Sequence, residues 1–319
     1  SKGIGGVKNM EANLKELSKK SDRITSGHRS CAGCGAPIVA KWVLKALKEG
    51  DKAVIGNATG CLEVSTTIFP YTVWKDSYIH SAFENAGATI SGVEAAYRAL
   101  NKNNKIDGNY KFIAFGGDGG TYDIGFQSLS GAMERGHDML YVCYDNGAYM
   151  NTGIQRSSAT PFGADTTTSP AGKVVPGKQQ YRKDLTKIMA DHHIPYVAQT
   201  VASKWKDLYE KAGKGIYTEG PAFINVLTPC SRGWRCDTST ELQLVDLAVE
   251  TCFWPLYEVI NGKYKLNYKP KNKLPITEWL KPQGRFKHLF KPENAYMLEA
   301  AQKEVDIRWE ELLMLCGEE

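Results

Sequence analysis

The chain has 319 residues, of which 42% are hydrophobic and 24% charged, with a formal net charge of +5 at pH 7. This composition is ordinary for a globular protein and excludes a disordered chain, while scattered lysines argue against a nucleic-acid partner. No apolar run approaches the ~20 residues of a membrane span, and the N-terminus lacks the apolar core of a signal peptide. We therefore expect a cytoplasmic protein whose eight cysteines are free thiols or metal ligands.

Predicted helices and strands alternate along the chain. In chain order, the patterns predict helices over 8–20 and 36–47, a strand over 52–56, a helix over 85–100, a strand over 110–117, a helix over 126–136, a strand over 138–145, a helix over 181–193, a strand over 194–200, a helix over 204–213, a strand over 221–227, and helices over 241–254 and 293–315.

The predicted strands are continuous apolar runs, which are typical of a parallel sheet covered on both faces. The expected fold is α/β, a doubly wound and mostly parallel sheet, over residues 25–255. Residues 1–24 form an N-terminal extension. Residues 256–319, locally basic at 261–273, are expected to form a C-terminal arm or helix that contacts partner subunits.

Functional side chains follow four of the predicted strands. Cys61 follows the first strand, Asp118 the second, Asn146 the third and Cys230 the last. Because ligands of open parallel sheets bind beyond the carboxyl ends of the strands, thiols and oxygen ligands are expected along one edge.

The oxygen ligands favour a magnesium–diphosphate site. Asp118 lies in the turn Gly117-Asp118-Gly119-Gly120, and Asn146 follows 28 residues later. The glycines let the backbone approach a ligand, and the amides after them can bind an anion at the start of a helix. Carboxylate and amide oxygens suit Mg²⁺. The alternative is a pair of ordinary turns at 117–120 and 146–147.

This spacing resembles the thiamine diphosphate motif, which begins with Gly-Asp-Gly and ends in an Asn-containing turn. The resemblance implies that Mg²⁺ is bound by Asp118, the side chain of Asn146 and the carbonyl of Ala148. The motif often closes with two successive Asn residues, whereas here Gly147 takes the second place.

Cys31 and Cys34 form the only C-x₂-C pair, so a zinc ribbon with two such pairs is not expected. The polar segment before the pair also differs from a thioredoxin site. A pair with two distant cysteines suits a [4Fe–4S] cluster, which takes four thiolates. Cys61 is the expected third ligand and Cys230 the fourth, with Cys236 as its competitor.

Segments along nearly the whole chain are similar to the beta subunit of multi-subunit pyruvate:ferredoxin oxidoreductases. They include HRSCAGCGAPIVA, NATGCLEV, HSAFENAGA, AFGGDGGTYDIGFQSLSGAMERGHD, YVCYDNGAYMNTGIQ, TPCSRGW and WPLYE. The resemblance implies a thiamine diphosphate-binding fold with a [4Fe–4S] cluster on Cys31, Cys34, Cys61 and Cys230. It also implies that Asn151 reaches the reacting end of the cofactor, with Thr152 in the same loop.

The implied reaction is the oxidative decarboxylation of pyruvate, with electrons passed through the cluster to ferredoxin and the acyl group to coenzyme A. Partners are alpha, gamma and ferredoxin-like delta subunits. The carboxylate that activates the cofactor is expected on the alpha subunit, because Glu63 and Glu84 are better explained as solvated or capping residues.

Two alternatives remain open. Oxalate or another 2-oxoacid can be the substrate of closely similar subunits. A non-catalytic assembly subunit, stabilised by zinc or a cluster, is the second. A nicotinamide enzyme is not expected, because no G-x-G-x-x-G follows the first strand.

Overall fold

Within residues 13–318, which the computed structural model describes, one eight-stranded sheet has the order β2-β1-β3-β4-β6-β5-β7-β8. Its strands are β1 (Lys52–Ala58), β2 (Ser77–Ser81), β3 (Tyr110–Gly117), β4 (Leu140–Asp145), β5 (Tyr196–Val201), β6 (Ala222–Leu227), β7 (Tyr257–Ile260) and β8 (Lys263–Leu266). Strands β1 to β6 run parallel, whereas β7 pairs antiparallel with β5 and with β8. After β1 the chain adds β2 on one side and β3 on the other, which makes a topological switch point between β1 and β3.

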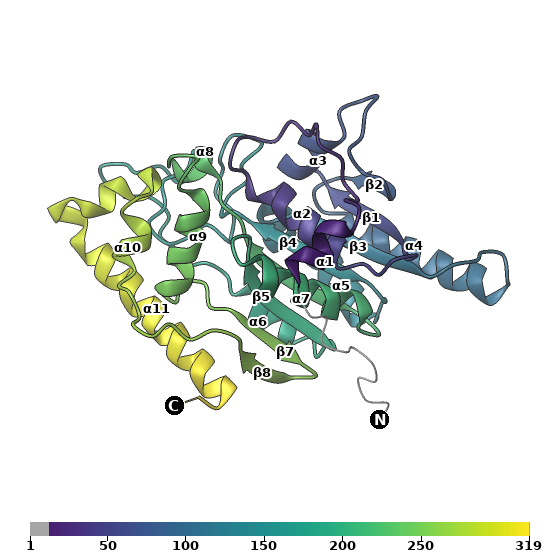
Figure 1. Ribbon diagram of the computed structural model, residues 1–319. Coiled ribbons are helices and arrows are strands. Elements are labelled where there is room, and N and C mark those ends of the chain that lie inside the picture. Colours follow the sequence, from purple (N-terminus) through teal and green to yellow (C-terminus); the bar gives the residue numbers. More distant parts are fainter. Residues whose placement is uncertain (1–12, 319) are drawn as a thin grey trace.

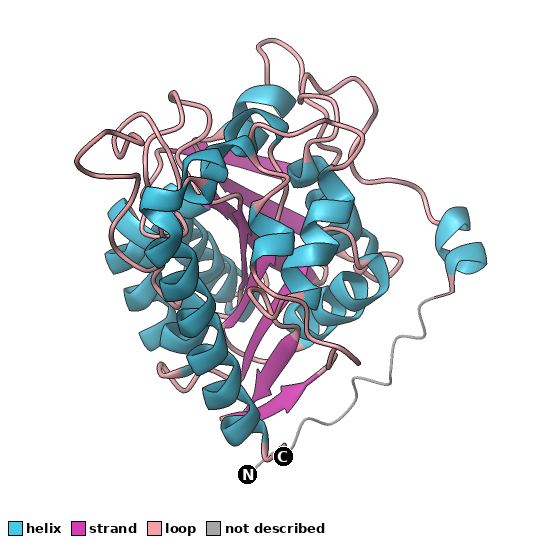
Figure 2. Cartoon of the chain, turned by 90° about the vertical axis from the view of Figure 1, so that its left-hand side faces the viewer, coloured by secondary structure: helices cyan, strands magenta, loops and turns pink. Residues whose placement is uncertain are grey.

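Helices cover both faces of this sheet, as Figure 2 shows. The α-helices are α1 (Leu14–Lys19), α2 (Gly35–Lys45), α3 (Cys61–Thr66), α4 (Ala86–Lys102), α5 (Phe126–Glu134), α6 (Leu185–Ala190), α7 (Trp205–Tyr217), α8 (Ser231–Trp234), α9 (Glu241–Glu250), α10 (Thr277–Leu280) and α11 (Ala295–Cys316). A π-helix, η1 (Gly120–Ile124), and two 3₁₀-helices, η2 (Gly284–Phe290) and η3 (Pro292–Asn294), complete the elements.

The apolar strands explain why the sheet is buried on both faces. Alternate residues of β3 point to opposite sides, so Phe115 belongs to the core cluster that includes α2 and α7, whereas Ala114 belongs to the cluster that includes α4, α5 and α9. All residues of β4, β5 and β6 are buried. Cys143, in β4, is fully buried among apolar neighbours and lies in the core.

The expected doubly wound, mostly parallel α/β fold is confirmed. Residues after 255 also contribute to the sheet, since β7 and β8 form a hairpin at its edge, joined by the turn Asn261-Gly262. Figure 1 shows α11 running along the outside of the molecule from this hairpin's end of the sheet. The division into segments 1–24, 25–255 and 256–319 stays a prediction. Of the helix predicted over 8–20, residues 8–12 lie outside the described part, and the rest is α1.

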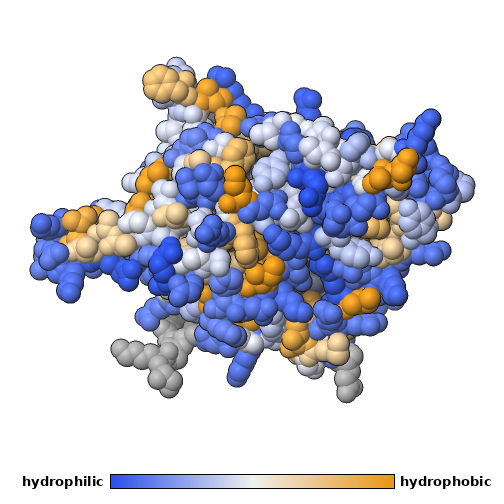
Figure 3. All heavy atoms as spheres, turned by 180° about the vertical axis from the view of Figure 1, so that it is seen from behind, coloured by the Kyte–Doolittle hydropathy of each residue, from blue (hydrophilic) through white to orange (hydrophobic). Residues whose placement is uncertain are grey.

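The surface is mixed in character. In Figure 3, apolar side chains lie in small groups among hydrophilic ones, and one group tips the loop that protrudes between α3 and β2. There Phe69 is 94% exposed and Tyr71 is 76% exposed. None of the helices in residues 13–318 has both the length and the apolar character needed to cross a bilayer.

Candidate active site

The carboxyl ends of the parallel strands bring the predicted functional residues to one edge. Cys61 is the first residue of α3, just after β1, and Asp118 directly follows β3. Asn146 directly follows β4, and Cys230 precedes α8, after β6. In Figure 1, α3 and α8 both lie at the upper end of the molecule, where these strands end.

Three oxygen atoms converge beyond β3 and β4. One terminal atom of the Asn146 amide lies 3.0 Å from Asp118 Oδ1 and 3.1 Å from the carbonyl oxygen of Ala148. That atom is the amide oxygen, so it faces two other acceptors, and only a rotated amide could donate to them. Ligands of octahedral Mg²⁺ at about 2.1 Å are about 3.0 Å apart along each edge. Both distances from the Asn146 amide therefore match the spacing of adjacent ligands around Mg²⁺.

The carboxylate of Asp118 is held in place from two sides. Its Oδ1 accepts from the backbone N–H of Asn146 at 3.3 Å, and its Oδ2 accepts from Ser157 Oγ at 2.5 Å. Burial and the neighbouring Asp145 raise the pKa of Asp118 well above its ordinary value. Asp145 already pairs with Arg182 at 3.1 Å, so a divalent cation at this position would supply the positive charge that Asp118 lacks.

The glycines of the turn are required partly by packing within the chain. A Cβ on Gly119 would lie 2.3 Å from the Tyr149 ring, and one on Gly120 would lie 2.5 Å from the Phe83 carbonyl oxygen. This tight backbone continues into the π-helix η1, which leads to α5. Short π-helical segments of this kind are frequent at functional sites.

The Cys31–Cys34 turn packs against the loop that carries Cys230. The N–H of Cys34 donates to the carbonyl of Cys31 at 3.2 Å, which closes the turn before α2. A Cβ on Gly35 would lie 2.5 Å from Cδ of Pro229, the residue before Cys230. Glycine is needed here because the two loops touch.

Electrostatics connect all four predicted cluster ligands. Burial, and to a smaller extent Cys230, Cys34 and Cys31 in that order, together raise the pKa of Cys61 to about 12. Burial likewise raises the pKa of Cys34 to about 11, with further contributions from Cys230 and Cys31. Cys34 and Cys61 therefore each sense charge on other predicted ligands, and a shared cationic iron cluster would favour their thiolates.

Cys236 interacts with fewer of the predicted cluster ligands than Cys34 and Cys61 do. Burial raises its pKa to about 11, and of the four predicted ligands only Cys230 contributes. Among the described residues, no three His, Cys, Asp or Glu side chains are close enough to bind a single metal ion. Ligands of a [4Fe–4S] cluster bind separate iron atoms and therefore lie further apart than ligands of one ion.

One cavity at the switch point is lined both by the oxygen trio and by one of the predicted cluster cysteines. Its walls include Cys61 from α3 as well as the turn after β3 and the loop after β4. The predicted residues that line it are Cys61, Gly117, Asp118, Gly119, Gly120, Asn146, Ala148, Asn151 and Thr152. Cys31, Cys34 and Cys230 do not line this cavity.

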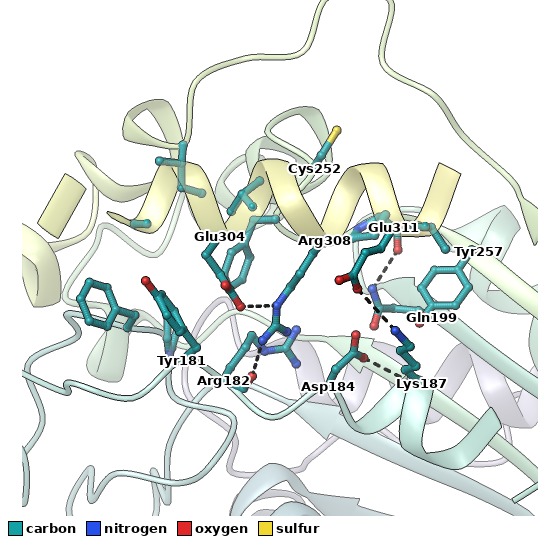
Figure 4. A pocket seen from close by; sticks show the side chains of 18 of the residues that line it. Tyr181, Arg182, Asp184, Lys187, Gln199, Cys252, Tyr257, Glu304, Arg308 and Glu311 are labelled. Carbon is teal, nitrogen blue, oxygen red and sulfur yellow. Dashed lines mark hydrogen bonds and ion pairs between the residues drawn. The ribbon is translucent and has the colours of Figure 1, made fainter. Parts of the chain in front are cut away.

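A larger cavity lies under α11, and Figure 4 shows its charged side chains. Arg308 donates to Glu304 at 2.5 Å and to the carbonyl of Arg182 at 2.8 Å, while Lys187 lies 3.4 Å from Glu311. These charges are already paired, and no predicted site residue lines this cavity. The predicted chemistry therefore lies in the smaller cavity.

Comparisons with known proteins show the family to which the chain belongs. A family model described as the C-terminal TPP binding domain of thiamine pyrophosphate enzymes matches residues 58–226. The chain is 51% identical to pyruvate synthase subunit PorB of Thermotoga maritima, over 96% of this chain and 97% of that protein. The chain belongs to the PorB family of thiamine diphosphate-dependent 2-oxoacid:ferredoxin oxidoreductases.

Other members of this family and one solved structure are also similar. PorB of Methanocaldococcus jannaschii is 53% identical over 90% of this chain and 95% of its own. Ketoisovalerate oxidoreductase subunit VorB of Pyrococcus abyssi is 44% identical over 91% and 92%. A structure of 2-oxoglutarate:ferredoxin oxidoreductase from Magnetococcus marinus, with 2-oxoglutarate, coenzyme A and succinyl-CoA bound, has a TM-score of 0.55. It covers 75% of this chain and 82% of its own at 21% identity, which supports the shared fold.

Sequence reasoning missed several residues that shape the site of this PorB-family chain. Ser157 binds Asp118 from a loop 39 residues away. Trp234 Nε1 donates to the carbonyl of Asn146 at 2.8 Å and so joins α8 to the oxygen trio. Arg285, from η2, stacks on Trp234. No local pattern marks these residues, because their partners come from distant segments.

Proposed function

We propose that this PorB-family chain carries thiamine diphosphate, Mg²⁺ and a [4Fe–4S] cluster in a pyruvate:ferredoxin oxidoreductase. The reaction converts pyruvate, coenzyme A and two oxidised ferredoxins into acetyl-CoA, CO₂, a proton and two reduced ferredoxins. The observation that carries the proposal is that Cys61 lines the same cavity as Asp118, Asn146 and Ala148. A cluster on Cys61 would then be adjacent to the cofactor, which gives electrons a short path.

In this proposal, the oxygen trio binds Mg²⁺. Asp118 supplies the charged ligand, and Asn146 and the Ala148 carbonyl supply neutral ones, with diphosphate and water completing the shell. Gly117, Gly119 and Gly120 line the cavity and would present backbone to the diphosphate. Trp234 and Ser157 hold Asn146 and Asp118 in position.

Thiamine diphosphate, when bound, supplies the carbanion that adds to the carbonyl of a 2-oxoacid. Asn151 and Thr152 lie in the cavity wall beyond the oxygen trio, where they can orient the substrate by hydrogen bonds. The thiolates of Cys31, Cys34, Cys61 and Cys230 would hold the cluster that accepts electrons one at a time. Cys61 is the ligand nearest to the reacting groups.

Other subunits are needed for activity. Among the described residues that line the cavity, no glutamate is present to activate the aminopyrimidine ring. Glu63 accepts from Thr67 Oγ1 at 3.0 Å and lies 3.6 Å from His80, so local contacts explain it. We assign the activating carboxylate to the alpha subunit, with gamma and ferredoxin-like delta subunits completing the complex.

The cellular setting proposed is the cytoplasm. All eight cysteines are free in the structure, as a reducing compartment requires. The acceptor beyond the delta-type subunit is a ferredoxin.

A substrate assay of the assembled complex tests the proposal. Reduction of a viologen dye is measured with pyruvate, 2-oxobutyrate, 2-oxoisovalerate, 2-oxoglutarate and oxalate, each with and without coenzyme A. We expect pyruvate to give the highest kcat/KM and to depend on coenzyme A. Activity without coenzyme A would favour oxalate instead.

A branched 2-oxoacid is the second candidate substrate, because the chain is 44% identical to a ketoisovalerate oxidoreductase subunit. A preference for 2-oxoisovalerate would move that candidate ahead. A colourless chain that contains zinc and no iron would support the non-catalytic assembly role and overturn the proposal.

A further inference from the structure

Arg285 lies between the two groups of predicted ligands, although it belongs to the C-terminal segment. The residue is 2% exposed, and its guanidinium lies 4.7 Å from the centroid of the Trp234 ring. A Cβ on Gly147, the residue after Asn146, would lie 3.1 Å from Arg285 Nη1. The guanidinium thus contacts the helix that follows Cys230 and the loop that contains the oxygen trio.

This buried cation has no carboxylate partner in an ion pair within the part of the chain that the structure describes. Its Nε donates to Gln283 Oε1 at 2.9 Å, and aromatic rings of Trp279 and Phe286 lie 5.7 and 5.0 Å away. By contrast, Arg182 in the same region pairs with Asp145 at 3.1 Å. A buried charge without a partner is costly, so some other negative group is expected to compensate it.

The groups that interact with Arg285 and can carry negative charge are thiols and buried carboxylates. Burial lowers the pKa of Arg285 to about 9, and Cys230, Cys236, Asp145 and Asp118 oppose that decrease, in that order. Cys230, a predicted cluster ligand, makes the largest of these contributions. The η2 segment is held at this place because the N–H of Gly284 donates to the carbonyl of Arg235, just after α8.

We propose that Arg285 is a positioning residue that raises the reduction potential of the cluster, because its buried charge lies against the helix that follows Cys230 and stabilises the reduced form of the [4Fe–4S] group. Reduction adds one electron and one negative charge to the cluster, so a nearby fixed cation favours the reduced state. The inference rests on the proposed function, since it requires the cluster on Cys31, Cys34, Cys61 and Cys230. It gives the C-terminal segment a role in electron transfer.

The test measures the reduction potential of the cluster in the full chain, reconstituted with iron and sulfide under anaerobic conditions. EPR-monitored redox titrations compare the parent with Arg285→Gln, Arg285→Lys and Arg235→Gln. We expect Arg285→Gln to reduce the one-electron equilibrium constant about tenfold, which is ~59 mV towards more negative potential. Arg285→Lys keeps the charge only while its buried amine is protonated, so at pH 6 its potential should stay near that of the parent.

Arg235→Gln is the matched control, because it removes a positive charge close to Cys230 in sequence but at the surface. The Arg235 side chain is 45% exposed and pairs with Asp165 at 2.6 Å, so solvent screens its charge. Its potential should change little. Equal shifts in Arg235→Gln and Arg285→Gln would overturn the inference, because burial of the charge would then be irrelevant.

The remaining outcomes are also decisive. If Arg285→Gln loses its iron while Arg285→Lys keeps it, the charge is what stabilises the cluster, and the inference is supported. If both lose it, or if Arg285→Gln keeps the parental potential, the inference is refuted. A parent chain that takes up no cluster at all would instead refute the proposed function.

Discussion

The role of Asp118 can be tested by Asp118→Asn, which removes one charge and preserves the size of the side chain. The carboxylate is 1% exposed and is a member of the oxygen trio. Removing one partner from a buried charge pair costs on the order of 3–5 kcal/mol, so thiamine diphosphate with Mg²⁺ should bind at least ~100-fold more weakly. The Tm of the ligand-free chain, by contrast, should not fall. Burial and Asp145 disfavour the Asp118 charge in the folded chain, so its removal should leave the Tm unchanged or higher.

The assay combines isothermal titration calorimetry, with thiamine diphosphate in excess Mg²⁺, and calorimetric unfolding without either ligand. Asp207→Asn is the matched control on the other face of the sheet. Asp207 pairs with the buried Lys211 at 2.8 Å, so its variant should have a lower Tm and normal affinity. Ser157 can remain bonded in Asp118→Asn, because its hydroxyl can rotate to accept as well as donate. Normal cofactor affinity in Asp118→Asn, or a Tm loss like that of Asp207→Asn, would refute the assigned role.

Two further predictions concern the cluster ligands and the effect of pH on stability. Cys61→Ala should lose most of the iron found per chain after reconstitution, whereas Cys236→Ala should retain it; the reverse result would mean that the ligand set is wrong. Burial lowers the pKa of Lys178 to about 7, so between about pH 7 and 10 the unfolded chain binds a proton that the folded chain lacks. Stability should therefore rise with pH in this range, relative to Lys178→Met, by up to about 1.4 kcal/mol per pH unit. Urea unfolding at pH 7, 8 and 9 measures this difference, and parallel pH profiles of the two proteins would contradict the explanation.

The central strands were predictable because their apolar runs are continuous. β3, for example, was expected over 110–117 and spans Tyr110–Gly117. β2 was missed, since its sequence SYIHS is polar and only half-buried at the edge of the sheet. The β7–β8 hairpin was missed for a different reason. Lysines in KYKL suggested a solvated arm, although Asn261-Gly262, with φ values of 48° and 77°, is a strong hairpin signal.

The candidate site was predictable where chemistry and strand ends coincide. Asp118 and Asn146 follow buried strands at a recognisable spacing, so topology alone brings them to one edge. Ser157 and Arg285 could not be found in this way. Their positions depend on how a long loop and the C-terminal segment fold back onto the sheet, and no residue spacing encodes those contacts.

The central claim is that a magnesium–diphosphate site and an iron–sulfur cluster share one edge of the sheet. Mn²⁺ can replace Mg²⁺, and its unpaired electrons speed the relaxation of a nearby reduced cluster, which EPR power saturation measures. We predict faster relaxation of the cluster signal when Mn²⁺ and thiamine diphosphate are both present, and no such effect in Asp118→Asn. Unchanged relaxation in the parent chain, with Mn²⁺ bound and the cluster reduced, would contradict the claim.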